Sequence, residues 1–181
     1  MLYDCPYKMH AAEIIHMYLW SYMDYKRVKQ YFENNVKHLY DASDTDKIIM
    51  ITTTYEPFFI IYVNRNFENV FRFNISQCLN KTPKILRGYI TTDTSLYIKS
   101  IRKMLDDHAI NIDKVNFTMV NYTSENHEVI CKMKTKYIDL THTGYEEILE
   151  TSMNCFLSKE TQTINGLPMT PYKHNIRHIR S

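Results

Sequence analysis

The strongest constraint on the fold is a pair of alternating segments joined by a short polar turn. Val115, Phe117 and Met119 alternate with polar residues, and the same alternation runs from Val129 to Tyr137. Successive side chains of a strand point to opposite faces, so each segment predicts a strand with one apolar face. The stretch Ser124–Asn126 between them carries turn chemistry. Together the two segments predict an antiparallel hairpin.

Further strand patterns lie in the first half of the chain. An isoleucine-rich run covers 47–53, and an apolar run covers 58–63. The apolar run predicts a strand that is buried on both faces. After turn residues at 64–66, the spacing of phenylalanines over 67–75 predicts a strand that returns as a second hairpin. A weaker pattern predicts a strand over 84–90.

Helical periodicity is present at both ends of the chain. Apolar residues recur every three or four positions over 9–23 and again over 25–40, which predicts two N-terminal helices. Oxygen-bearing residues at 91–95 predict the start of a helix that runs to about residue 108. A capping-box pattern at Thr143–Glu146 predicts a last helix over 145–156.

These patterns predict an α+β fold with two N-terminal helices, a largely antiparallel sheet built from two hairpins, and two later helices. Apolar periodicity stops at Ser158, and Gly166, Pro168 and Pro171 oppose regular structure beyond it. We therefore expect one globular domain over 1–157 and a polar to basic, extended tail over 158–181.

Several classes of function are excluded by what the chain lacks. Its three glycines, Gly88, Gly144 and Gly166, stand far apart, so neither a P-loop nor a dinucleotide-binding fingerprint is present. No serine lies between close glycines as in a nucleophile elbow. We predict no catalytic residue, no cofactor and no metal ligand. An enzyme whose catalytic groups form no local motif stays open as an alternative.

The chain also carries signs of its compartment. No apolar run of about 18 residues is present, and the first residues do not resemble a signal peptide. We therefore expect an intracellular protein, in the cytoplasm or nucleus of a host cell, with no membrane partner. The four cysteines, Cys5, Cys78, Cys131 and Cys155, are far apart in sequence, so we expect free thiols.

Lys132, Lys134 and Lys136 alternate along the second strand of the 115–137 hairpin. A period of two places all three on one face of the strand, where they could hold phosphate groups. The simpler interpretation is a solvated face that discourages edge pairing. Net charge is only +2, which does not by itself require a nucleic-acid partner.

The tail carries a second group of basic residues, namely Lys173, His174, Arg177, His178 and Arg180. Such arms contact nucleic acid or acidic partners. Lys173, Arg177 and Arg180 are therefore candidate contact residues beside the lysine row. His174 and His178 could in principle chelate zinc with Cys131 and Cys155, but that cysteine spacing matches no common zinc module.

Residues 18–23 (YLWSYM) and 119–122 (MVNY) are rich in Tyr and Met, and the chain is short and has few glycines. In this composition the chain resembles small accessory proteins of large DNA viruses. In size the chain is similar to baculovirus late expression factors, and poxviral host-interaction proteins share the composition. The resemblance implies a non-enzymatic adaptor that supports late viral gene expression through protein contacts. The alternative is a nucleic-acid-binding protein that uses the lysine row and the basic tail.

Overall fold

The computed structural model describes residues 11–43, 45–88, 94–107, 114–141, 146–157, 163–164 and 167–168. Its helices are α1 (Ala11–Asn35), α2 (Lys37–Asp41), α3 (Arg65–Phe71), α4 (Ile75–Cys78) and α5 (Ser95–Asp106), with a 3-10 helix η1 (Pro83–Leu86). Its strands are β1 (Ile48–Thr53), β2 (Ile60–Val63), β3 (Lys114–Tyr122), β4 (Glu128–Asp139), β5 (Glu147–Leu157), β6 (Thr163–Ile164) and β7 (Leu167–Pro168).

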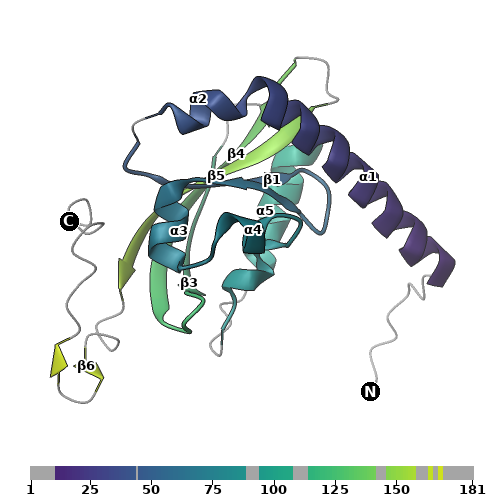
Figure 1. The fold of residues 1–181 in the computed structure, drawn as a ribbon. Coiled ribbons are helices and arrows are strands. Elements are labelled where there is room, and N and C mark those ends of the chain that lie inside the picture. The colour runs from purple at the N-terminus through teal and green to yellow at the C-terminus, as the bar shows by residue number, and fades with distance from the viewer. Residues whose placement is uncertain are drawn as a thin grey trace, which may run out of the picture.

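Five strands form one antiparallel sheet in the order β2-β1-β5-β4-β3 (Figure 1). The hairpin predicted from the alternating segments is confirmed as β3 and β4, with Phe117 opposite Met133. The last long strand, β5, lies in the middle of the sheet between β1 and β4. The predicted α+β class, with N-terminal helices and an antiparallel sheet, is confirmed. The tail contributes the short antiparallel pair β6–β7.

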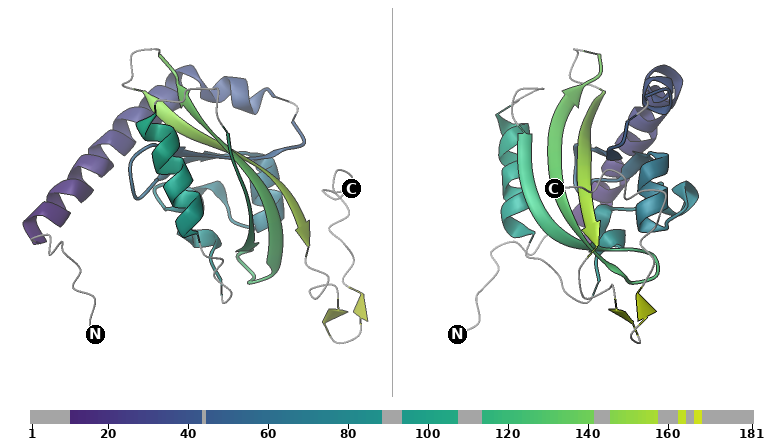
Figure 2. Two further views of the ribbon diagram at one scale, coloured as in Figure 1. Left: turned by 180° about the vertical axis from the view of Figure 1, so that it is seen from behind. Right: turned by 90° about the vertical axis from the view of Figure 1, so that its left-hand side faces the viewer.

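Helices cover both faces of this sheet, and α5 and α1 lie on opposite sides of it (Figure 2). The side chains of strand β1 alternate between the two faces of the sheet. Ile49 and Ile51 pack on the face covered by α1, which we call the outer face. Met50 and Ile48 point to the face covered by α3, α4 and η1, which we call the inner face. Helix α5 extends the inner layer over β3, β4 and β5.

The outer face is packed with aromatic rings. Phe32 of α1, Tyr40 of α2 and Tyr62 of β2 contact one another with ring centroids 5.4–5.8 Å apart. The Tyr40 hydroxyl donates a hydrogen bond to Glu150 at 2.6 Å, and the Tyr62 hydroxyl donates to Asp41 at 3.1 Å. Burial and the neighbouring carboxylates raise the pKa of both phenols. The rings therefore stay neutral and keep their hydrogen bonds.

The two N-terminal helices are divided at a different place from the one predicted. Residues 24 and 25 lie inside α1, which continues without interruption to Asn35 before α2 begins at Lys37. Asp24 pairs with Arg27 one turn later at 2.7 Å, so its charge is compatible with the helix interior. The start of the predicted first helix, at 9–10, lies outside the described residues.

The strand predicted over 67–75 is wrong, because this segment contains α3 and the start of α4. Asn64 begins α3, and its side chain accepts a hydrogen bond from the backbone N–H of Phe67. Phe67 and Phe71 are four residues apart, a spacing that fits one face of a helix as well as one face of a strand. The hairpin on this side of the sheet is instead β1 with β2.

The helix predicted over 145–156 is also wrong, because residues 147–156 belong to the strand β5. Ile148 packs on the outer face, whereas Leu149 packs on the inner face against α5. A central strand with both faces buried carries apolar residues on both parities, and these can imitate a helical period. The predicted capping residues 143–145 lie outside the described residues.

The strand predicted over 84–90 is replaced at its start by η1. The Thr82 side chain accepts a hydrogen bond from the Lys84 N–H, and Pro83 occupies the first turn. Residues 89–90 lie outside the described part of the chain. Among the helices described, none has the length and apolar character needed to cross a membrane.

Candidate functional site

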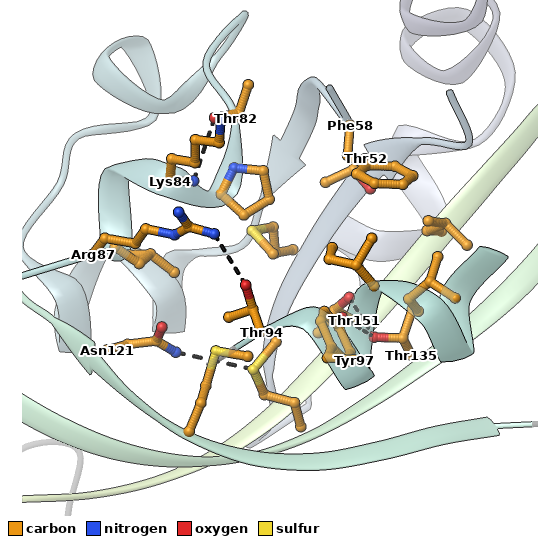
Figure 3. Close-up of a pocket in the computed structure, with 18 of the residues that line it drawn as sticks. Thr52, Phe58, Thr82, Lys84, Arg87, Thr94, Tyr97, Asn121, Thr135 and Thr151 are labelled. Carbon is orange, nitrogen blue, oxygen red and sulfur yellow. Dashed lines mark hydrogen bonds between the residues drawn. The ribbon is translucent and has the colours of Figure 1, made fainter. Parts of the chain in front are cut away.

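A cavity lies between the inner face of the sheet on one side and the helices η1 and α5 on the other. Its volume is about 120 Å³. Four strands of the sheet, β1, β3, β4 and β5, form its floor, and Figure 3 shows most of the residues that line it. The cavity opens to solvent at one side, and a mostly apolar cavity of this kind is the leading candidate for a binding site.

Most of the wall is apolar. Met50, Met119 and Met133 enter from three different strands, and Ile98 and Ile101 close the cavity from α5. Methionine side chains are flexible and polarisable, so a wall that is rich in them can adapt to the shape of a ligand. The wall therefore favours an apolar ligand body.

Three hydroxyl groups gather at one end of the cavity (Figure 3). The Tyr97 hydroxyl lies 2.7 Å from Thr135 Oγ1, which lies 2.9 Å from Thr151 Oγ1. Burial raises the pKa of Tyr97, although its contacts with the two threonines oppose the rise. The phenol is therefore neutral, and this end of the cavity is polar but uncharged.

The opposite side of the lining carries positive charge. Lys84 and Arg87 both line the cavity, and the Arg87 guanidinium donates a hydrogen bond to Thr94 Oγ1 at 3.1 Å. Both cations are exposed to solvent, so they lie at the rim. No aspartate or glutamate is among the described lining residues. The electrostatic character of the rim therefore favours an anionic group over a cationic one.

Local sequence explains how η1 is held over the sheet. A Cβ added at Gly88 would lie 2.3 Å from the ring of Tyr122, so the ring occupies the space that any other residue would need. Tyr122 ends β3, and its hydroxyl donates to Glu128 at the start of β4. Gly88 thus lets the chain leave η1 in contact with the β3–β4 hairpin.

Three of the predicted free cysteines are confirmed as free and buried, and Cys5 lies outside the described residues. Cys131 and Cys155 are opposite one another on β4 and β5, with their sulfur atoms 2.8 Å apart. Burial and the charge of Glu68 raise the pKa of the Cys78 thiol to about 11. None of the three lines the cavity. Within the described ranges, no group of three His, Cys, Asp or Glu side chains could hold a metal.

The structure places the lysine row on the outer face of β4, as its spacing predicts. Lys136 pairs with Glu150 at 2.9 Å, and the Lys132 ammonium lies 5.5 Å from the centre of the Phe156 ring. Two of the three cations therefore have contacts inside the protein. Lys173, Arg177 and Arg180 lie outside the described residues. A contact role for these six residues stays a prediction.

The sequence reasoning did not find the cavity. One signal was available, because Thr52, Thr135 and Thr151 occupy buried positions of strands that are otherwise apolar inside. Buried hydroxyls need partners, so three of them on one face of a sheet indicate either a polar network or a ligand. The strand assignments needed to bring them together included β5, which was interpreted as a helix.

No family model matches the chain, and no curated protein matches it. Solved structures do. The LOV domain of a blue-light activated histidine kinase from Erythrobacter litoralis EL346 is 16% identical with a TM-score of 0.50, covering 62% of this chain and 97% of that one. The PAS domain of the fruit-fly ELK potassium channel is 15% identical with a TM-score of 0.54, covering 70% and 98%.

A further light-oxygen-voltage domain, from a study of a flavin analogue, is 16% identical with a TM-score of 0.51, covering 70% of this chain and 86% of that one. At these identities the likeness shows the fold alone. The chain has the fold of PAS and LOV domains.

The predicted kinship with baculovirus late expression factors is therefore wrong, and so is the adaptor role in late viral gene expression that it implied. The resemblance rested on the composition of segments 18–23 and 119–122, and composition does not identify a family. Segment 119–122 ends a sheet strand beside the cavity, whereas 18–23 lies on α1. Tyr, Met and Ile occur at strand and helix positions of this kind in many unrelated proteins.

Proposed function

We propose that this domain senses a small organic anion with an apolar body, which it binds in the inner-face cavity. The observation that carries the proposal is the cavity itself, with methionine and isoleucine walls, a neutral hydroxyl end and a cationic rim. The fold supports a sensory role, because one of the similar domains belongs to a kinase that blue light activates. Binding would act by changing the packing of α5 on the sheet.

The size of the cavity argues for a small ligand. Its volume of about 120 Å³ is close to the roughly 150 Å³ of an engineered cavity that binds benzene, and well below the roughly 300–1,000 Å³ of sites for drug-sized molecules. A flavin has three fused rings and a long polar chain. The residues of this cavity, as they are placed, do not fit it. A single-ring carboxylic acid does fit these limits.

Calorimetric titration with benzoate and with benzamide tests the proposal. The two probes have the same ring, but only benzoate carries a charge. We expect benzoate to bind about tenfold more tightly, because its carboxylate can accept charge-assisted hydrogen bonds from Arg87. Arg87→Gln should remove most of that preference while both probes still bind.

A matched pair of variants on α5 locates the binding site. Ile98→Phe adds volume inside the cavity and should weaken binding of both probes at least about tenfold. Leu96→Phe, on the same helix but exposed and outside the lining, should leave both affinities unchanged. Failure of both probes to bind, or equal effects of the two variants, would refute the cavity as the site.

One sequence prediction stays a proposal beside this one. The division into a domain over 1–157 and a tail over 158–181 implies that deleting the tail leaves the melting temperature nearly unchanged. A loss of more than about 5 °C would show that the tail stabilises the domain.

A further inference from the structure

Two cysteine side chains on neighbouring strands of the sheet lie in direct contact. Cys131 of β4 and Cys155 of β5 are register partners, and both belong to the core cluster of the inner face. Their sulfur atoms lie 2.8 Å apart. The Cys131 thiol donates to the Val129 carbonyl at 3.6 Å, which leaves the Cys155 thiol as the donor between the two sulfurs. Neither thiol lines the inner-face cavity, so the proposed ligand site does not explain the pair.

The position of the pair in the strand ladder fits a disulfide. Residues directly opposite in an antiparallel ladder have Cα atoms about 4.5 or 5.5 Å apart, and disulfides span Cα separations of about 4.4–6.8 Å. The backbones of β4 and β5 therefore need no rearrangement. A disulfide bond is about 2.05 Å long, so the sulfur atoms of Cys131 and Cys155 need to approach by only about 0.8 Å from their separation of 2.8 Å.

Cys78 provides an internal comparison for this pair. It belongs to the same core cluster and is as deeply buried as Cys131. It lies on the short helix α4, however, whereas Cys131 and Cys155 lie opposite one another on adjacent strands. Burial is therefore common to all three thiols, and the strand register distinguishes the pair.

The pair is buried but lies close to one end of the strand ladder. Cys131 and Cys155 are 0% and 3% exposed. Only two register pairs separate Cys155 from the end of β5 at Leu157. Strand ends open locally at a lower free-energy cost than the middle of a sheet. Opening of the last residues of β5 therefore admits a small oxidant to Cys155.

The protonation of Cys155 makes this opening necessary. The hydrogen bond with Cys131, and then burial, raises the pKa of the Cys155 thiol. The thiolate is the reactive form of a cysteine, so Cys155 is inert while the sheet is closed. It reacts only from the open strand end, and Cys131 is then the thiol nearest to it in the ladder.

We propose that Cys131 and Cys155 form a reversible disulfide between β4 and β5 when the protein is exposed to hydrogen peroxide. In the first step the Cys155 thiolate attacks one peroxide oxygen. An S–O bond forms, the O–O bond breaks, and the departing hydroxide takes up the thiol proton and leaves as water.

In the second step the Cys131 sulfur attacks the sulfenic sulfur of Cys155. The S–S bond forms, the S–O bond breaks, and hydroxide leaves as water with the Cys131 proton. Each cysteine sulfur gives up one electron, and the peroxide takes up two. A dithiol such as dithiothreitol reverses the reaction by exchange and is itself oxidised to a disulfide.

Peptide mapping of the full chain tests the proposal. The reduced, native protein is treated with hydrogen peroxide, its remaining thiols are blocked with N-ethylmaleimide, and it is digested with trypsin without reductant. Cleavage after Lys and Arg places Cys131 in peptide 115–132, Cys155 in 137–159 and Cys78 in 73–81. We expect peptide 115–132 linked to 137–159 in a species that dithiothreitol separates, with the blocking group on 73–81.

Matched variants separate the pair from burial alone. Cys131→Ser removes the thiol that captures the sulfenic acid, so Cys155 should then be trapped by dimedone instead of linked. Cys78→Ser changes an equally buried thiol of the same cluster and should leave the link intact. Circular dichroism checks that each variant keeps its secondary structure.

Thermal unfolding supplies a second readout. The crosslink joins residues 24 positions apart, so oxidation should raise the melting temperature of the wild type by roughly 5–10 °C and leave that of Cys131→Ser unchanged. The proposal is overturned if wild-type Cys131 and Cys155 stay free after peroxide treatment. It is equally overturned by a link from either one to Cys5 or Cys78, or by sulfinic acid on Cys155 in place of the link.

Discussion

The two faces of the sheet differ in how tightly side chains pack against them. On the outer face, Phe32, Tyr40 and Tyr62 fill the space beneath α1 and α2 with rings. On the inner face, methionines and threonines leave a cavity under α5. Both faces belong to the same sheet, so the contrast lies in the side chains of each face and in the helices that cover it. We infer that the outer face mainly supplies stability and that the inner face gives up some packing to receive a ligand.

The largest expected effect comes from truncating one residue on each face. Phe32→Ala removes a fully buried ring and should lower the free energy of unfolding by about 3–5 kcal/mol. Met119→Ala enlarges a cavity that already exists, and its side chain is only half-buried, so it should cost about 1 kcal/mol. Urea denaturation measures both. Equal costs would show that the inner face is packed as tightly as the outer one.

At alkaline pH, the free energy of unfolding should fall in two steps, one from a buried group on each side of the sheet. Burial, then the charge of Glu68, raises the pKa of Cys78 on the inner side from 9.0 to about 11. Burial, then the charge of Glu33, raises the pKa of Tyr25 on the outer side from 10.0 to about 12. Each folded-state group keeps its proton after the unfolded chain has lost it.

The stabilisation from Cys78 is therefore complete below about pH 9 and is lost as the pH rises to about 11. That from Tyr25 is lost between about pH 10 and 12, and each loss is about 2–3 kcal/mol. Denaturant titrations at several pH values should show Cys78→Val flattening the first decline and Tyr25→Phe the second. A decline unaffected by either variant would contradict these assignments.

The smallest expected difference concerns two buried hydroxyl groups. Tyr40 donates to the charged Glu150, whereas Tyr97 shares a hydrogen bond with the neutral Thr135. Tyr40→Phe should cost about 1.5–3 kcal/mol and Tyr97→Phe about 0.5–1.5 kcal/mol. Benzoate affinity should change more in Tyr97→Phe than in Tyr40→Phe, because of the two tyrosines only Tyr97 lines the cavity. Unfolding curves and benzoate titrations on the same two variants make the comparison.

How far the sequence predicts this fold depends on how many faces of each element are buried. Strands β3 and β4 were predicted correctly, because their outer face is exposed and their side chains alternate cleanly. Strand β5 was interpreted as a helix, because Ile148 and Leu149 are buried on opposite faces. Helix α3 was interpreted as a strand, because Phe67 and Phe71 fit both periods.

The candidate site could not be predicted for a related reason. Its lining comes from four strands, η1 and α5, so no local motif records it. The hydrogen-bonded residues Arg87 and Thr94 are seven positions apart in sequence, whereas Tyr97 and Thr135 are thirty-eight positions apart. Such contacts depend on the sheet order, which places β5 between β1 and β4. The exposed apolar residues of α1 were visible as helical periodicity, but only the structure shows that they extend past the domain.

The central claim is that the inner-face cavity binds a small apolar anion, and methionine-methyl NMR tests it most directly. Met50, Met119 and Met133 line the cavity, whereas Met17 and Met23 lie on α1 and serve as internal controls. On titration with benzoate, the account predicts saturable shifts of the three cavity methyls and no shift of the two controls. Unchanged cavity methyls at saturating benzoate, or shifts confined to Met17 and Met23, would contradict it.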